Sequence, residues 1–563
     1  MEYDPVLFEI VPALMEWLAV FASLFVVGTV IAFLASFIHY GTDGPIRFIN
    51  GLGTSLFEIV TPAPRRIFAL ATLTFREAIR NKILLVFVLF AILFMFAGWF
   101  MSSSKGRPDL EVAINVSFVL KVISILVMIV LLLLSCWGIP ADIKARSLHT
   151  VVTKPVTYME IILGRFFGYL SVGTVILLIM AGIGYTWILR QTPNSVEKEY
   201  LICRVPEYGN LSFIDTFGRP AKKGINVGDI WEYRSFIQGG SKARAIWVFE
   251  DVSKDDLVTV KKYDKVKKKD VVVGQFLQLE SRFGVFRTHK GNINKGVIFR
   301  YTLLNDKGTK TEDDDLKVPL TNLESNEFKE QVTSIPLTIK YRLNTKKTKN
   351  KEYTANLFDD LVSDGKLIVE VECSEGGQNI GMGKADLFIR TPDKPFWIGY
   401  SKAILSIWLM LMLVVALGVS ASTFAKGPVA TLAVVSFVIV GLVAYEHLDH
   451  TVKDWKAGKL QGGGAIESVH RIVTHKNPST KIEDGTGKKV MKTADIPLFY
   501  LLQGMSKIIP NLSKFKAIEW VSKGYDVPWR TSLFHAIAIT AGFSFPALLL
   551  GFFSLKYREL ESK

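Results

Sequence analysis

The sequence predicts a polytopic α-helical membrane protein with about seven transmembrane helices and an inserted extracytoplasmic β-rich, sandwich-like domain. Three observations predict this class. Seven runs are long and apolar enough, or nearly so, to cross about 30 Å of hydrocarbon as helices. Region 190–397, between two of these runs, is polar and rich in β-branched residues. The 563 residues are 49% hydrophobic and 21% charged, as expected when very apolar and very polar segments alternate.

The seven apolar runs share a length near that of a membrane-crossing helix, and none has the polar face of a soluble amphipathic helix. We therefore expect all of them to be shielded from water. In chain order the runs are Trp17–Ile38, Ile83–Met101, Val116–Trp137, Phe166–Leu189, Ala403–Phe424, Pro428–Tyr445 and Leu533–Leu555.

Basic residues in short flanking segments predict the orientation of these helices. Segments 39–82 and 139–165 and the tail 556–563 are rich in Lys and Arg, so we expect them in the cytoplasm. The start, MEYDPVLFEI, is acidic, has no Lys or Arg and lacks the basic region of a secretory signal peptide. The prediction is a multi-pass protein of the cell inner (plasma) membrane, with the N-terminus outside and the C-terminus cytoplasmic. The alternation of seven spans then places regions 190–397 and 447–531 outside. Their lysine-rich stretches do not contradict this, because long domains largely escape the charge rule.

Region 190–397 is expected to form β structure. Its runs ARAIWVFE, VVVGQFLQL, GVIFRYTLL, KLIVEVEC and ADLFIR alternate or are rich in β-branched residues, and Gly, Asn and Asp clusters separate them. A β-sandwich or jelly roll accommodates so many short strands. Cys203 and Cys373 both lie here, where an oxidising compartment would permit a disulfide between them; the alternative is two unrelated thiols.

A polar but patterned segment, PADIKARSLHTVVTKPVTYMEIILGRF, connects the third and fourth apolar runs. Apolar residues recur in its second half at helical spacing, SLHTVV is long enough for one or two helical turns, and Pro155 separates the two parts. The pattern predicts a short helix across the mouth of the two flanking membrane helices, so that a push on it would move both. The alternative is an ordinary linker.

This segment resembles the cytoplasmic coupling region of ABC transporter permeases of the type-two exporter class. Two further stretches agree in order: TFREAIRNKILLVF, Thr74–Phe87, resembles the amphipathic helix that opens these permeases, and IIPNLSKF, Ile508–Phe515, resembles their ending together with the final run and FFSLKYREL. The likeness covers residues 65–189 and 398–560 and is greatest to the subgroup that includes the permease of copper-site maturation transporters. In the coupling segment it is carried by Asp142, His149-Thr150-Val151, Lys154-Pro155-Val156 and Glu160 to Arg165.

The resemblance implies a permease subunit of an ATP-driven exporter, present as one of two copies or with a paralogue. It also implies a six-helix core, to which the first run, Trp17–Ile38, adds one N-terminal helix. It implies the following domains: 1–64, extra helix and cytoplasmic linker; 65–189, first part of the core with the coupling segment 139–165; 190–397, β-rich domain; 398–446, second part of the core; 447–531, extracytoplasmic loop with interfacial helices; 532–563, last span and tail. The residues expected to form the ATPase-coupling surface are Arg76, Glu77, Asp142, Arg146, Thr150, Lys154, Pro155 and Glu160.

ATP hydrolysis is expected in a separate chain. The nearest approach to a phosphate-binding loop, EDGTGKKV at Glu483–Val490, lacks the first glycine and the Ser/Thr of that motif. We therefore expect no enzyme activity, no cofactor and no metal site in this chain, with ATP and Mg bound by partner cytoplasmic ABC ATPase subunits. The net charge of +15 is attributed to the membrane surface and not to nucleic acid, because no nucleic-acid-binding motif is present.

Three alternatives remain open at this point. A membrane-anchored extracytoplasmic binding or assembly scaffold would place the active part in the β-rich domain. A membrane enzyme would need paired acids or a nucleophile with its base, and neither HExxH nor GxSxG occurs. A mechanotransmitter would pass ATP energy to the β-rich domain without moving a substrate. The sequence does not name the substrate or the ligand of the β-rich domain.

Overall fold

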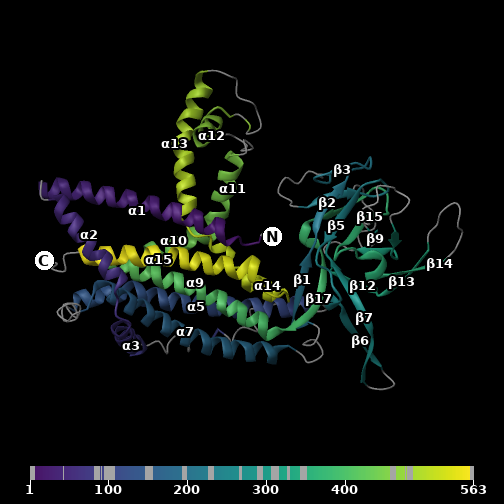
Figure 1. Cartoon of the computed structure of the whole chain (residues 1–563), viewed down its shortest axis with the longest axis horizontal. Helices are drawn as coiled ribbons and strands as arrows, with labels where there is room; N and C mark the ends of the chain where they lie inside the picture. Colours follow the sequence, from purple (N-terminus) through teal and green to yellow (C-terminus); the bar gives the residue numbers. More distant parts are fainter. Residues whose placement is uncertain are drawn as a thin grey trace. The chain divides into compact units, whose positions relative to one another are not determined.

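The computed structural model describes residues 7–41, 44–80, 89, 92–93, 108–145, 156–192, 200–225, 234–264, 269–287, 296–305, 316–325, 330–342, 352–456, 464–475, 477 and 486–557. The chain divides into two compact units (Figure 1). The β unit comprises Leu201–Gly399 together with Gly524–Asp526, and the helical unit comprises the segments Leu7–Tyr200, Tyr400–Lys523 and Val527–Lys563.

The helical unit contains six helices, within the described part of the chain, that are long and apolar enough to cross a membrane. They are compatible with a membrane protein, as predicted. The second predicted run, Ile83–Met101, lies almost entirely outside the described residues. The six are Ile10–Ile38, Leu110–Lys144, Tyr158–Gln191, Phe396–Phe424, Gly427–Lys456 and Trp529–Tyr557.

The six membrane-length helical spans are longer than the apolar runs that predicted them. A π-helical turn, Val440–Ala444, joins α10 to α11, and another, Trp529–Leu533, precedes α15. The helices are α1 Ile10–Tyr40, α2 Gly44–Val60, α3 Pro64–Arg80, α5 Pro108–Lys144, α7 Tyr158–Gln191, α9 Phe396–Phe424, α10 Gly427–Ile439, α11 Tyr445–Lys456, α12 Ala465–Val473, α13 Thr486–Ile508, α14 Ala517–Ser522 and α15 Phe534–Tyr557.

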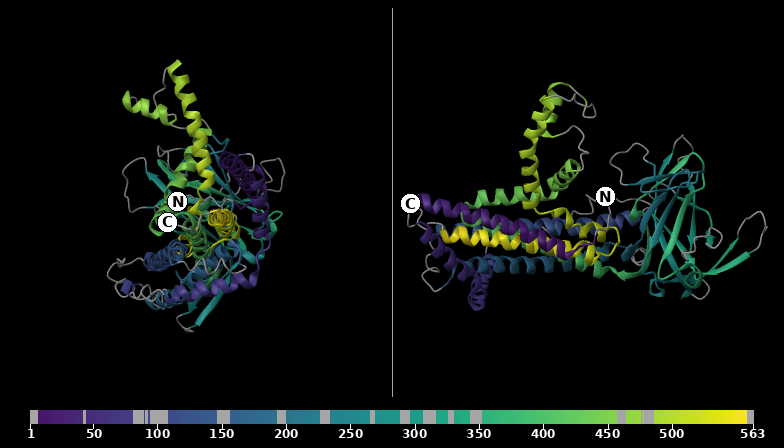
Figure 2. Two further views of the ribbon diagram at one scale, coloured as in Figure 1. Left: turned by 90° about the vertical axis from the view of Figure 1, so that its left-hand side faces the viewer. Right: turned by 45° about the horizontal axis from the view of Figure 1, so that its top comes forward.

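Long helices of the helical unit run side by side (Figure 2). α5 packs against α7 and α10, and α7 also packs against α3 and α15. α1, the helix predicted in addition to the six-helix core, contacts α15: the Trp17 indole donates a hydrogen bond of 2.8 Å to the Gly542 carbonyl. Apolar side chains of α5, α9 and α10, among them Leu132, Leu413 and Val434, form one buried cluster.

The polar segment 139–165 is divided between two long helices where the structure describes it. Its first residues belong to the end of α5, which contains Pro140. Its last residues form the first turns of α7, because Thr157 caps that helix and starts it eight residues before the apolar run predicted at Phe166. Residues 146–155, which include the turns predicted from SLHTVV, lie outside the described residues.

The β unit consists of antiparallel sheets, in agreement with the prediction. The larger sheets have the strand orders β10-β9-β15-β5-β2-β3, with β11 beside β9, and β1-β17-β7-β12, with β6 beside β7. β4-β16-β8 and β13-β14 form two small sheets. The strands are β1 Ile202–Tyr208, β2 Asn210–Ile214, β3 Pro220–Ala221, β4 Ser235–Gln238, β5 Arg244–Phe249, β6 Val258–Asp264, β7 Lys269–Ser281, β8 Gly284–Arg287, β9 Val297–Leu304, β10 Lys317–Pro319, β11 Leu323–Ser325, β12 Gln331–Pro336, β13 Thr338–Arg342, β14 Glu352–Asn356, β15 Leu367–Cys373, β16 Gln378–Met382 and β17 Leu387–Pro395.

The two larger sheets share one hydrophobic core, as in a sandwich. Trp247 of β5 and Tyr301 of β9 lie in the same buried cluster as Leu279 of β7 and Ile389 of β17. Side chains alternate between the core and the surface along β9 and β15, which is the pattern that predicted these strands. All five sequence runs predicted as strands correspond to β5, β7, β9, β15 and β17.

The possible disulfide between Cys203 and Cys373 is absent from the structure, which contains all three cysteines as thiols. Cys203 lies on β1 and Cys373 on β15, in different sheets. Each thiol is buried and donates to nearby backbone carbonyls, Cys203 to Phe396 at 3.8 Å and Cys373 to Glu375 at 3.7 Å. The two cysteines are therefore unrelated thiols, the alternative that the sequence left open.

Candidate functional site: an ion cluster joining three helices

Two of the predicted coupling residues, Glu77 and Asp142, meet at a third residue, Arg165. Glu77 lies on α3, Asp142 near the end of α5 and Arg165 in the second turn of α7. The guanidinium of Arg165 donates from Nη1 to Glu77 Oε2 at 2.7 Å and from Nη2 to Asp142 Oδ2. The side chains of Arg165 and Asp142 are only 12% and 10% exposed. One guanidinium thus joins three helices at the ends of α5 and α7 that flank segment 146–155.

Two glycines on either side of this arginine allow the close approach that the cluster needs. A side chain at Gly164 would clash with Leu70, and one at Gly168 would clash with Thr74, both on α3. Small residues four apart let two helix backbones pack closely in a membrane. The sequence GRFFG therefore brings α3 against α7, and Arg165 within reach of Glu77.

Glu160, a third predicted coupling residue, has a different place. Its side chain is 1% exposed and forms a capping box with Thr157: Thr157 N donates to Glu160 Oε2 at 3.0 Å, and Glu160 N donates to Thr157 Oγ1 at 3.3 Å. Glu160 Oε1 also accepts from Ala63 N at 2.8 Å, next to the first residue of α3, and Oε2 lies 3.6 Å from Arg66 Nη1. Glu160 therefore fixes the start of α7 against the start of α3 and offers no surface to a partner.

The remaining predicted coupling residues are separated from this cluster or lie outside the described residues. Arg76 is exposed on α3. Arg146, Thr150, Lys154 and Pro155 belong to the part of the chain that the structure does not describe.

A cleft of about 340 Å³ adjoins the ion cluster. Its lining is mostly apolar and includes the side chains of Glu77 and Tyr169. It is lined by Glu77, Ala78, Leu133, Leu134, Trp137, Gly138, Ala141 and Tyr169.

Arg165 and Tyr169 are the residues of the candidate site that the sequence did not single out. Arg165 was part of the matched motif, but nothing in the motif assigned it a partner. A usable signal was present: residues 165 and 169 are one helical turn apart and therefore share a face of α7. The GxxxG pattern around Arg165 was a second signal, because it marks a face where another helix packs closely.

One titratable group of the β unit, Glu207, has a pKa in the neutral range. Burial, followed by repulsion from Asp256 and Asp251, raises the pKa of Glu207 on β1 to about 7. Within the described ranges, no three His, Cys, Asp or Glu side chains are arranged to hold a metal ion.

Comparison with known proteins identifies no family. No protein-family model matches the chain, and neither the curated proteins nor the solved structures include a match. The functional interpretation therefore depends on the residues themselves.

Proposed function

We propose that the chain is the membrane-spanning permease subunit of an ATP-driven ABC exporter. In this proposal it couples ATP hydrolysis by a separate nucleotide-binding subunit to substrate export or to movement of the β unit. The observation that carries the proposal is the cluster of Glu77, Asp142 and Arg165.

The cluster suits a coupling role because of its place in the chain. Segment 146–155 connects the end of α5 to the start of α7, and Arg165 joins both helices to α3. A force applied to this segment would reach three helices together instead of bending one. Arg165 and Asp142 are largely desolvated, so separating this pair would leave the Asp142 carboxylate buried without compensation, at about 3–5 kcal/mol. The Glu77 side chain is 48% exposed, so its pair with Arg165 adds less. The penalty at Asp142 favours movement of α5 and α7 as one body.

The proposed arrangement in the cell follows from the basic segments. Seven spans, with Ile83–Met101 as the second, place the N-terminus outside, the C-terminus in the cytoplasm and the β unit outside the inner membrane. The partners are two cytoplasmic ABC ATPase subunits, which bind ATP and Mg, and a second permease, identical or paralogous. The chain itself then needs no catalytic residue.

The test is purification from native membranes in mild detergent, with identification of co-purifying proteins and an ATPase assay. Two variants alter the coupling region: replacement of residues 150–155 by a Gly-Ser linker of equal length, and Arg165→Gln. Arg190→Gln, at the exposed far end of α7, is the matched control. We expect an ATPase to co-purify with the wild type and the control, and its turnover to fall at least about tenfold in both coupling variants while the permease remains folded. Normal turnover in both coupling variants would refute the coupling role.

A second candidate function is a membrane-anchored extracytoplasmic scaffold. It is favoured by the β unit's own extensive hydrophobic core. In that case the same purification would yield envelope proteins bound through the β unit, and no ATPase. That outcome would replace the permease proposal.

A further inference from the structure

A short segment, Gly524–Trp529, joins the β unit to the last apolar helix; we call it the strap. Its first half, Gly524–Asp526, belongs to the β unit, and its second half begins at Val527 in the helical unit. No residue lies between the two halves. Each half is held by its own set of bonds.

The first half of the strap pairs with the edge of β1 as a parallel bridge between Arg204 and Tyr525. Arg204 N donates to Gly524 O at 2.8 Å, and Asp526 N donates to Arg204 O at 2.8 Å. The Asp526 carboxylate accepts from Lys394 Nζ of β17 at 3.0 Å. The first half of the strap is therefore bonded to the edge of the β unit by one bridge and one ion pair.

Tyr525 and Arg204 also interact through their side chains. The Arg204 guanidinium carbon lies 5.1 Å from the centroid of the Tyr525 ring, a cation–π distance. The edge of the Phe388 ring on β17 meets the same tyrosine, with centroids 5.9 Å apart. Burial raises the pKa of the Tyr525 hydroxyl well above its ordinary value, so the ring is neutral in the physiological range.

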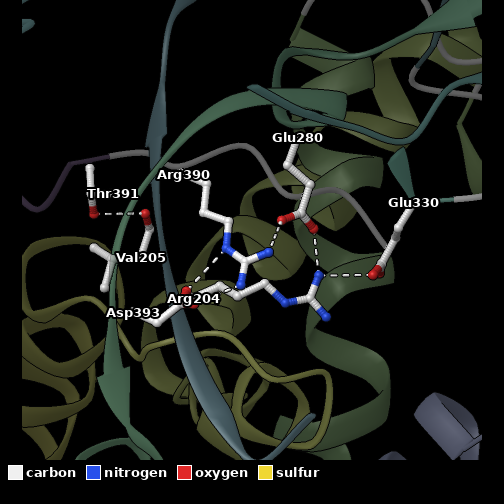
Figure 3. A network of polar contacts seen from close by, with 7 residues as sticks. All are labelled: Arg204, Val205, Glu280, Glu330, Arg390, Thr391 and Asp393. Atoms are coloured by element: carbon white, nitrogen blue, oxygen red, sulfur yellow. Dashed lines mark hydrogen bonds and ion pairs between the residues drawn. The ribbon is translucent and has the colours of Figure 1, made fainter. Parts of the chain in front are cut away.

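Arg204 is itself held by a buried ion network (Figure 3). It donates to Glu280, whose side chain is 1% exposed, and to Glu330 Oε2 at 2.8 Å. Arg390 lies 3.5 Å from the other oxygen of Glu280 and donates to Asp393 at 2.7 Å. Burial raises the pKa of Glu280, and the two arginines oppose this effect. A shift of Arg204 would break contacts to both glutamates, so the network resists displacement of the strap.

The second half of the strap is held from α9, the helix that follows β17 without an intervening residue. Lys402, buried on α9, donates from Nζ to Val527 O at 2.9 Å. Its amine also lies 5.9 Å from the centroid of the Trp529 ring. Buried basic groups in membrane segments are uncommon and usually functional. Here the lysine joins the start of α9 to the turn that leads into α15.

We propose that the strap is a transmission element: the contact of Lys402 with Val527 and the network around Arg204 are energetically coupled through the strap backbone. Val527 directly follows Asp526 in the chain. If Lys402 moves and carries Val527 with it, the strap backbone must therefore either stretch the Arg204–Tyr525 bridge or be held back by it. This inference goes beyond the proposed function, since the coupling is a property of this chain and needs no ATPase. If the proposed function holds, the strap is one route by which helix movement reaches the β unit.

Hydrogen exchange of the full chain in lipid nanodiscs, read by mass spectrometry, tests the coupling. Lys402→Met removes the bond to Val527, and we expect exchange at the Arg204 amide to accelerate at least about fivefold, the low end of usual coupling effects. Amides in the middle of β15 should remain unchanged. Trp529→Leu, which keeps the lysine bond, is a milder second variant and should give a smaller acceleration at the same amide.

Insertion of Gly-Ser-Gly between Asp526 and Val527 should leave both sets of bonds intact but abolish the effect of Lys402→Met at Arg204. The same insertion after Gly376, in an exposed turn, is the control and should leave that effect intact. Unchanged Arg204 exchange in folded Lys402→Met and Trp529→Leu proteins would overturn the proposal. A uniform acceleration throughout the β unit would also overturn it, because it would indicate general unfolding. Neither result depends on whether an ATPase binds.

Discussion

The junction of α3 and α7 at Glu160 allows a quantitative prediction. Glu160→Ala removes the acceptor of two backbone N–H groups, Ala63 N at 2.8 Å and Thr157 N at 3.0 Å. The site is closed to water, since the Glu160 side chain is 1% exposed. Each orphaned buried donor costs about 1–3 kcal/mol, so we expect the helical unit to lose about 2–6 kcal/mol of stability.

Two matched variants separate the contribution of the Glu160 acceptor oxygens from that of its ion pair with Arg66. Glu160→Gln keeps one carbonyl oxygen as an acceptor, so its loss should be about half as large. Arg66→Ala removes only a 3.6 Å ion pair from a side chain that is 46% exposed, and it should lose less than about 1 kcal/mol. From the most to the least stable, the predicted order is therefore Arg66→Ala, Glu160→Gln and Glu160→Ala.

The assay uses the buried thiol of Cys136 on α5 as the reporter of unfolding. With Cys203 and Cys373 replaced by Ala, a thiol-reactive dye in a thermal ramp responds only when the helical unit opens. Roughly 2–4 °C per kcal/mol then predicts a fall of several degrees for Glu160→Ala. If Glu160→Ala melts no lower than Arg66→Ala, the capping and junction role assigned to Glu160 is wrong.

Three further predictions concern both units. In a double-mutant cycle of Arg165→Met and Asp142→Ala, the double variant should lose about 1–3 kcal/mol less stability than the two single losses added together, because Arg165→Met leaves the buried Asp142 carboxylate without its arginine and Asp142→Ala removes one of the two carboxylates that Arg165 binds; thermal unfolding measures this, and additive losses would contradict the ion pair. Glu207 has a pKa raised from 4.5 to about 7 by burial and neighbouring aspartates, so the native state binds its proton more tightly than the unfolded chain does. The β unit should therefore lose stability as the pH rises from about 4.5 to about 7, and Glu207→Gln should remove that part of the pH dependence in urea unfolding; an unchanged profile would count against it. Alkylation of the denatured, unreduced protein should label both Cys203 and Cys373, and a mass matching a disulfide would contradict the structure.

Sequence reasoning found the elements of the fold more completely than the contacts of the site. The five β runs and six of the seven apolar runs correspond to strands and long helices, because hydrophobic periodicity is a local property of the chain. Helix ends were less well predicted: α7 starts at Tyr158 because Thr157 and Glu160 form a capping box, which apolar runs do not reveal.

In the candidate site too, the sequence indicated residues but did not predict their contacts. Glu77, Asp142 and Glu160 were selected by their resemblance to a motif, but their roles differ: two meet an arginine, and the third is a buried cap. The pairing of Arg165 with Glu77 joins residues 88 positions apart, and no local pattern specifies such a partner. The sequence left open whether Cys203 and Cys373 are bonded, since two cysteines in one domain do not reveal which sheet each occupies; the structure contains both as thiols.

By itself, the sequence determined the protein's class: apolar helices of membrane length interrupted by a polar, antiparallel β region. It could do so because burial of apolar surface depends mainly on which residues recur at which spacing. Only the tertiary structure decided that Arg165 joins three helices, and that Arg204 and Lys402 hold the two halves of the strap. Such charged groups are placed by long-range packing, and their energies depend on burial and on partners that the chain brings together only when it folds.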